Sequence, residues 1–87
     1  MKWKIEYSRR AYKFIEKHKI HDEIKKVVVN FLRMIKGEPV KVDVKRLKGE
    51  WKDYLRIRKG KLRIILKVEW KRKTILVEAI DFRGNIY

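Results

Sequence analysis

The chain has 87 residues, 45% of them hydrophobic, and carries 26 Lys and Arg against 11 Asp and Glu, a formal net charge of +15. This length and apolar content suit one small folded domain over residues 1–87 and argue against wholesale disorder. The excess positive charge predicts a polyanionic partner such as nucleic acid, because solubility alone needs far less charge.

Several other classes of protein are disfavoured by simple features of the sequence. The chain has no Cys, which excludes disulfides and thiolate metal sites. Its longest uncharged run, VVVNFL, is much shorter than the roughly 20 residues of a transmembrane helix. The opening MKWKIEYS lacks the apolar core of a signal peptide. We therefore expect a cytoplasmic protein with no membrane partner.

The first half of the chain predicts one strand and two helices. Residues 1–7 alternate between apolar and polar side chains, which indicates a strand with one buried face. Ser8 suits a helix N-cap, and helical spacing of apolar residues then continues to His18. A longer helical pattern spans 20–35, and Gly37 is suited to ending it. We expect the two helices to form an antiparallel hairpin.

The second half of the chain predicts strands, because the apolar period falls from about 3.6 to 2. VDVKRLKGEW, at 42–51, is expected to be a short strand or an extended loop. Strands are then predicted at 54–58, 62–70 and 74–82. The predicted fold class is α+β in the order β-α-α-β-β-β. We expect an antiparallel sheet with the helical hairpin packed on one face.

The stretch YLRIRKGKLRII predicts a hairpin with clustered arginines. With Lys59-Gly60 as a two-residue loop, three cross-strand pairs follow: Arg58 with Lys61, Ile57 with Leu62, and Arg56 with Arg63. All four basic residues then share the face opposite the core. An Arg–Arg pair costs on the order of 1 kcal/mol at a wet surface, while guanidinium groups suit phosphate oxygens. A solvated basic strand is the alternative.

The segments LKGEWKDYLRIRKGKLRIILKV and IDFRGNIY resemble the RelE/ParE toxin superfamily. The shared features are a Leu-Lys-Gly turn, an alternating Arg strand, a Gly turn, an Arg entering an apolar strand and a terminal Arg-x-x-x-Tyr. The element order also matches that fold along the whole chain. RelE-like members are ribosome-dependent endoribonucleases that cut mRNA in the decoding site. The resemblance therefore implies metal-independent attack of a ribose 2′-OH on the adjacent phosphate, with no cofactor.

The resemblance also implies which residues form the catalytic site. Arg56 and Arg58 match the two basic strand residues of the family, and Arg63 matches the arginine that stabilises the transition state. Arg83 matches the arginine near the C-terminus that meets the scissile phosphate or the leaving group. Tyr87 matches the terminal tyrosine, which stacks on a base or orients the 2′-OH.

Two positions depart from the family pattern. One of the two strand residues is usually a Lys implicated as general base, whereas Arg58 stands here, and Arg is not deprotonated in proteins. Many members carry His just before the C-terminal arginine, whereas this chain has Phe82. The sequence therefore leaves the identity of the general base open.

Further basic and titratable residues have less specific assignments. Basic residues on either side of the arginine strand are expected to bind RNA phosphates: Lys45, Arg46, Lys48 and Lys61. His18 and His21 lie three residues apart beside Asp22, but no third ligand is placed, so we expect structural or solvent-facing histidines and no metal site.

The second face of the sheet is also predicted to carry apolar residues. Extending the hairpin pairing places four of them beside the arginines: Ile65, Leu76, Ile80 and Phe82. Apolar side chains on both faces indicate that something covers the second face. The resemblance implies a RelB-like antitoxin protein, often helical and acidic; the chain's own C-terminus or a second copy are the alternatives.

Three functions remain open on the sequence. A RelE-like protein would bind the ribosome and cleave mRNA. A ParE-like protein would share the fold but poison DNA gyrase without cutting RNA. A nonenzymatic basic domain would bind nucleic acid, and each Arg-to-Ala change would weaken that binding by a similar modest amount. The set of four arginines and Tyr87 favours the ribonuclease.

Overall fold

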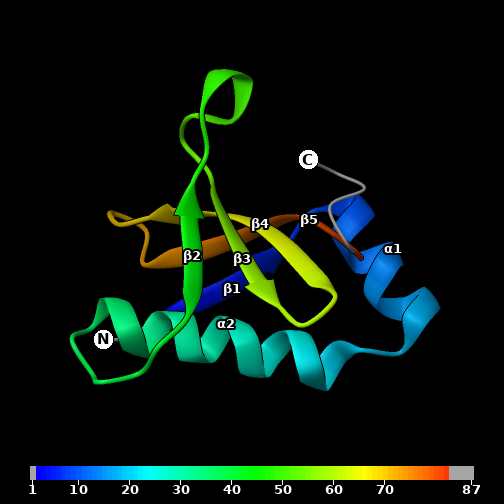
Figure 1. Cartoon of the computed structure of the whole chain (residues 1–87), viewed down its shortest axis with the longest axis horizontal. Helices are drawn as coiled ribbons and strands as arrows, with labels where there is room; N and C mark the ends of the chain where they lie inside the picture. Colours follow the sequence, from blue (N-terminus) through cyan, green and yellow to red (C-terminus); the bar gives the residue numbers. More distant parts are fainter. Residues whose placement is uncertain (1, 83–87) are drawn as a thin grey trace.

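A computed structural model describes residues 2–82 of the chain. The elements follow in the order β1 (Lys4–Tyr7), α1 (Arg9–His18), α2 (His21–Ile35), β2 (Asp43–Arg46), η1 (Gly49–Trp51), β3 (Leu55–Lys59), β4 (Leu62–Glu69) and β5 (Thr74–Phe82) (Figure 1). The predicted α+β class and the order of elements are confirmed. The segment that the sequence left between strand and loop forms a strand, β2, followed by a short 3₁₀ turn, η1.

The strands form one five-stranded sheet in the order β1-β5-β4-β3-β2. All neighbouring pairs are antiparallel except β1 and β5, which are parallel. The prediction of a wholly antiparallel sheet was therefore wrong for this pair. Alternating side chains reveal which face of a strand is buried but carry no information on its direction. The other pairs join strands that follow one another in the chain, which favours antiparallel pairing, whereas both helices and three strands separate β1 from β5.

Both helices bury their apolar faces in one core, but they do so at different places. α2 lies across one face of the sheet, and α1 lies beside β5 (Figure 1). α1 begins where β1 ends: the Ser8 backbone N–H donates to the Val77 carbonyl, and the Ser8 hydroxyl accepts from the Ala11 N–H. The predicted N-cap is confirmed. The two predicted helices are also confirmed, and the Ser8–Val77 bond fastens the start of α1 along β5.

The core lies between α2 and the sheet. Its fully buried residues come from both helices and from three strands: Ala11, Ile15, Ile24, Val28, Phe31, Ile57, Ile64, Leu66, Ile75 and Val77. Alternation along β3, β4 and β5 places these strand residues on one face. The residues between them point to the opposite face of the sheet, away from α2.

The hairpin between β3 and β4 has a different register from the one predicted. Lys59 pairs with Leu62, Arg58 with Arg63, and Ile57 with Ile64. The two-residue loop is therefore Gly60-Lys61, in which Gly60 has a φ of +58° and occupies the first loop position, as in type II′ turns. A shift of this kind leaves every side chain on its predicted face. Burial alone therefore did not distinguish the two registers, and the turn decided between them.

A bulge in β5 corrects a second prediction. Ile65 pairs with Ala79 and the next residue, Leu66, pairs with Val77, so Glu78 stands opposite no residue of β4. Such an extra residue reverses the alternation beyond it. Ile80 and Phe82 consequently lie on the core face, not beside the arginines as predicted. Ile65 does lie on the predicted face.

A small second cluster covers part of the face opposite α2. Leu47, Ile65 and Ala79 are buried there, and Trp51 and Tyr54 pack against them. The covering residues come from the connection between β2 and β3, which projects from the body of the molecule at the top of Figure 1. The chain thus covers Ile65 and Ala79 on its own second face with this connection, which was not among the expected covers.

Candidate functional site

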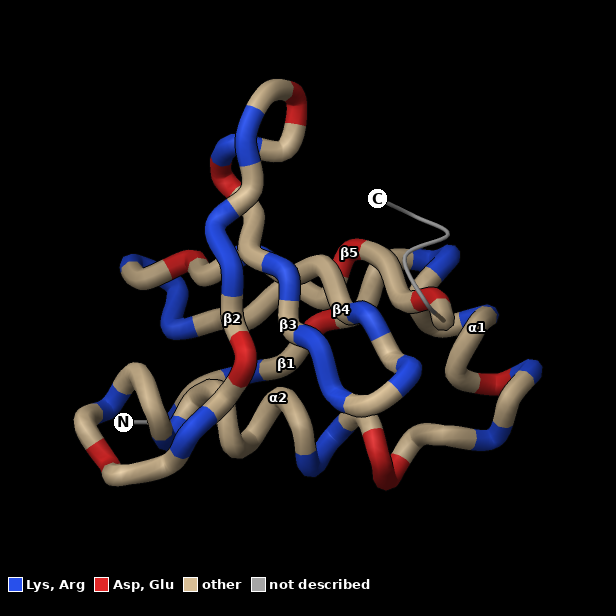
Figure 2. The backbone as a smooth tube through the Cα atoms, viewed as in Figure 1, with Lys and Arg blue, Asp and Glu red and all other residues tan. Residues whose placement is uncertain are grey.

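The face opposite α2 carries rows of charged side chains that run across the sheet. Residues paired across strands project to the same side. One row runs Asp43, Arg58, Arg63, Asp81, and the next runs Lys45, Arg56, Ile65, Ala79. Lys and Arg segments gather along β2, β3 and the turn into β4 (Figure 2). We call the set Lys45, Arg56, Arg58 and Arg63 the arginine face.

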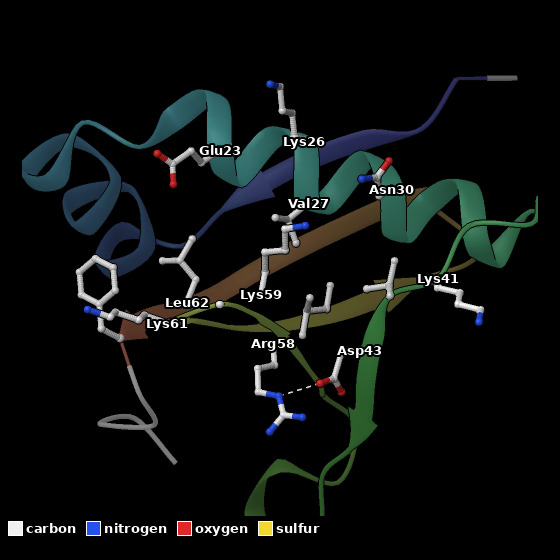
Figure 3. Close-up of a pocket in the computed structure, with 14 residues that line it drawn as sticks. Glu23, Lys26, Val27, Asn30, Lys41, Asp43, Arg58, Lys59, Lys61 and Leu62 are labelled. Carbon is white, nitrogen blue, oxygen red and sulfur yellow. Dashed lines mark hydrogen bonds and ion pairs between the residues drawn. The ribbon is translucent and has the colours of Figure 1, made fainter.

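Asp43 on the edge strand β2 pairs with two of these arginines. The Arg58 Nε donates to Asp43 Oδ2 over 2.6 Å, and the Arg56 Nη2 lies 3.6 Å from Asp43 Oδ1. The Arg58–Asp43 pair is drawn in Figure 3. A charge-assisted bond of this length is among the stronger polar contacts in proteins. Asp43 therefore offsets part of the repulsion between the arginines.

Arg63 is held by the backbone of the turn. Its Nη1 donates to the Gly60 carbonyl over 2.8 Å and to the Leu62 carbonyl over 3.0 Å. Hydrogen bonds within residues 2–82 engage no other nitrogen of this guanidinium. Arg58 stands directly opposite Arg63 on β3, but its guanidinium group turns toward Asp43 on β2.

Arg56 is the most enclosed member of the arginine face. Its side chain is 16% exposed, and its Nε is buried with no hydrogen-bond partner among residues 2–82. It lies between Lys45 and Ile65 in its row. A buried donor without a partner costs stability, on the order of 1–3 kcal/mol. Such a donor is suited to receiving an acceptor oxygen from a ligand.

Other cations and two aromatic rings adjoin the arginine face. The Arg10 guanidinium lies over the Trp51 ring, 5.7 Å from its centroid, and the Lys67 ammonium lies 5.8 Å from the centroid of Tyr54. Sequence reasoning missed Arg10, because only the folded chain brings α1 next to the β2–β3 connection. It also missed Asp43, although the alternation Asp43-Val44-Lys45 places Asp43 and Lys45 on one face.

The structure separates the predicted RNA-binding residues into different places. Lys45 joins the arginine face opposite Arg56, while Arg46 pairs with Leu55 and projects to the core side. Lys48 is exposed just before η1, and Lys61 is exposed in the β3–β4 turn. Arg83 and Tyr87, the remaining predicted catalytic residues, lie outside the described residues.

A groove of about 460 Å³ opens between α2 and the end of the β3–β4 hairpin. Its apolar lining includes Val27, Ile57, Leu62 and Phe82. Charged residues line the same groove, and cations outnumber anions among them: Lys26, Lys41, Arg58, Lys59 and Lys61 against Glu23 and Asp43 (Figure 3). The Arg58–Asp43 pair thus stands where the groove meets the arginine face.

The histidines lie apart from the arginine face. The His18 ring packs 4.3 Å from the Phe14 ring and 5.1 Å from the Phe82 ring, centroid to centroid, and the His21 ring lies 6.4 Å from Tyr7. Within residues 2–82, no three His, Asp or Glu side chains are grouped as metal ligands. None of the helices described here is long and apolar enough to cross a membrane.

The arrangement is chemically suited to an anion with several oxygens. Three guanidinium groups on adjacent strands present planar N–H donors that bind phosphate oxygens two at a time. The fold and the site therefore define a class of protein: a small α+β domain that binds anions through a cluster of cations on one sheet face.

Comparison with known proteins finds similar solved structures. No family model matches the sequence, and no curated protein matches it. Among solved structures, the archaeal RelE–RelB complex from Pyrococcus horikoshii OT3 contains a chain 27% identical, with a TM-score of 0.63 over 98% of this chain and 99% of that one. A chain of the RelB–RelE complex of Methanococcus jannaschii is also 27% identical, with a TM-score of 0.63 over 94% of each chain.

A third structure extends the likeness in fold. YafQ from E. coli strain BL21(DE3) is 20% identical, with a TM-score of 0.67 over 99% of both chains. The chain is thus similar to RelE toxins in sequence and in fold along nearly its whole length, as the sequence resemblance predicts.

Proposed function

We propose that this protein is an endoribonuclease toxin that cuts mRNA in the decoding site of the ribosome. The observation that carries the proposal is the arginine face, in which Arg56, Arg58 and Arg63 stand on the same side of two adjacent strands and are held by Asp43 and the turn carbonyls. Repulsion between like charges gives the isolated protein no benefit from this cluster. An RNA phosphate as ligand explains why it is present.

The proposed reaction needs no cofactor. The ribose 2′-oxygen attacks the adjacent phosphorus, the bond from phosphorus to the 5′-oxygen breaks, and the products are a 2′,3′-cyclic phosphate and a free 5′-hydroxyl. A base takes the 2′-OH proton, and an acid supplies a proton to the departing oxygen. The guanidinium groups stabilise the charge that develops on the phosphorane oxygens.

The arginines take different parts in this scheme. In this proposal Arg63, whose guanidinium group is oriented by the turn carbonyls, binds the phosphorane, and its cross-strand neighbour Arg58 binds the same phosphate. The buried Nε of Arg56 would donate a hydrogen bond to an oxygen of the RNA. From the family resemblance, Arg83 meets the scissile phosphate or leaving group, and Tyr87 positions the 2′-OH or stacks on a base.

The surroundings of the arginine face are suited to a longer RNA. Lys45 and the exposed Lys48 and Lys61 are proposed to contact flanking phosphates of mRNA or rRNA. Such contacts fix position more than sequence choice. Trp51 on the projecting connection offers a ring for base stacking.

We also propose an antitoxin partner and a cytoplasmic location. Two of the similar structures are RelE–RelB complexes. The groove beside α2 joins an apolar floor to a cationic rim, which suits an acidic amphipathic segment of a RelB-like antitoxin. Such a segment would also reach Arg58 at the edge of the groove. Lys59 lines the same groove, so a Lys59→Glu variant, which reverses a charge there, should bind its antitoxin more weakly.

The test is cleavage of mRNA on programmed ribosomes, with 5′ ends mapped by primer extension. The wild-type protein should cut in the decoding site. Arg63→Ala should slow that cutting by about 100-fold or more, because a preorganised charge at the transition state is lost. Arg33→Ala is the matched control: Arg33 is an exposed arginine on α2 that pairs with Glu38 and lies outside the arginine face.

Each negative result points to a different rival. Intact mRNA with tight ribosome binding would indicate a protein that binds without cutting. Intact mRNA without ribosome binding would reject the proposal and call for a gyrase assay, the ParE-like alternative. Equal losses in Arg63→Ala and Arg33→Ala would assign the effect to net charge and not to the site.

A further inference from the structure

Asp43 contacts both arginines of β3 from the edge of the sheet. Its two carboxylate oxygens face different partners, Oδ2 toward Arg58 at 2.6 Å and Oδ1 toward Arg56 at 3.6 Å. Among the described residues, no other carboxylate forms an ion pair with Arg56, Arg58 or Arg63. We infer that Asp43 is a positioning residue that fixes these two arginines for phosphate; this inference rests on the proposed function.

The atoms involved explain how the positioning works. Asp43 accepts from the Nε of Arg58, which lies at the root of the guanidinium group. The fork formed by the two Nη atoms is thereby left for a phosphate, which it binds through two parallel bonds. Asp43 approaches Arg56 through Nη2 instead, so that the buried Nε of Arg56 keeps its donor for another acceptor.

We call the two ion pairs of Asp43 with Arg56 and Arg58 the clamp. The position of Asp43 in the sheet makes the clamp rigid. Asp43 begins β2 and lies directly across the ladder from Arg58, while Lys45 lies across from Arg56. Both members of each pair thus stand on hydrogen-bonded strands, which hold geometry better than loops do. The carboxylate is 43% exposed, so water and ions reach it, and its removal leaves no buried cavity.

The carboxylate of Asp43 should also lower the affinity for RNA. A negative charge beside a phosphate site repels the ligand and weakens binding. Removing the charge should therefore tighten binding of RNA, while loss of the clamp should slow cleavage because the arginines no longer hold one geometry. A purely structural residue would weaken both steps, and a purely electrostatic one would improve binding without slowing the chemistry.

The experiment compares Asp43→Asn with wild type in two assays. Affinity is measured for a short mRNA on ribosomes with a 2′-deoxy nucleotide at the cut site, and single-turnover cleavage is measured for the all-ribose mRNA. We expect Asp43→Asn to bind about threefold to tenfold more tightly and to cut about 10-fold to 100-fold more slowly. Asp43→Glu, which restores the carboxylate, should recover part of the rate.

Two controls carry the same change of charge. Asp81→Asn lies at the other end of the Asp43–Arg58–Arg63 row but forms no ion pair with the arginines among the described residues, so it should tighten binding without disturbing Arg58. Glu38→Gln is remote, pairing with Arg33, and should leave binding and rate unchanged. An unchanged cleavage rate in Asp43→Asn would overturn the inference.

An activity-independent readout separates this inference from the proposed function. In ¹⁵N spectra of the free protein, the Arg58 Nε–H should give a distinct signal that exchanges slowly with water. In Asp43→Asn that signal should merge with those of solvent-exposed arginines, and in Asp81→Asn it should not. If the wild-type protein cuts no mRNA, the proposed function fails while the signal still tests the clamp. A signal that is the same in wild type and Asp43→Asn refutes the clamp.

Discussion

The two faces of the sheet are built on different physical principles. On the face under α2, Ile57, Ile64 and Ile75 are fully buried and pack against apolar helix residues, so shape and area determine stability. On the arginine face, cross-strand neighbours are charged, and order depends on specific ion pairs and hydrogen bonds. The first face holds the fold together. The second face retains groups that the fold alone does not require.

The largest expected effect on stability lies on the core face. Ile64→Ala should lower the free energy of unfolding by about 3–4 kcal/mol, because the lost contacts and the cavity left behind both cost stability. Urea denaturation followed by circular dichroism measures this change. Val29→Ala, at an exposed position on α2, is the control and should change stability little. A loss below 1 kcal/mol at Ile64 would contradict the asymmetry between the faces.

A smaller effect is expected where the β2–β3 connection covers the second face. Leu47 is buried, but its cluster has few members and lies near solvent, so neighbours can relax into the space. Leu47→Ala should therefore cost about 2 kcal/mol, at the low end of the range for such truncations. The same denaturation experiment measures it. A cost equal to that of Ile64→Ala would mean that the connection is part of the main core.

A still smaller effect, of opposite sign, is expected at Arg56. Arg56→Met keeps much of the side-chain length but removes a largely buried charge whose Nε has no hydrogen-bond partner among residues 2–82. Stability should rise slightly, by at most about 1 kcal/mol, while RNA cleavage falls. Denaturation at low salt, together with the ribosome assay, checks both signs. Arg33→Met is the matched control, and a clear loss of stability in Arg56→Met alone would show that Arg56 supports the fold.

The smallest effect concerns Tyr7 at the end of β1. Burial raises the pKa of the Tyr7 hydroxyl above its ordinary value, which is about 10. The unfolded chain therefore loses this proton at lower pH than the folded one, so the Tyr7 contribution is intact below about pH 10 and is lost as pH rises toward the folded pKa. The free energy of unfolding, measured by urea denaturation, should fall less in Tyr7→Phe than in wild type between about pH 9 and 11. The same dependence on pH in both proteins would contradict a raised pKa of Tyr7.

Much of the fold and part of the site followed from local patterns. The alternation along β3 and β4 correctly placed Ile57 and Ile64 in the core and Arg56 and Arg63 opposite them. The Arg58–Arg63 pairing was missed, because a shift of two residues leaves both faces unchanged. The bulge at Glu78 was also missed, since no turn residue or break in the sequence marks it. It moved Ile80 to the core.

By itself, the sequence determined the class of fold, the order of its elements and the clustering of basic side chains on one sheet face. These features depend on hydrophobic period and on local signals such as Ser8 and Gly37, which act over a few residues. The tertiary structure decided the direction of β1, the register of the hairpin and the contact of Asp43 with Arg58. Those features depend on contacts between segments far apart in the chain, which no local pattern encodes.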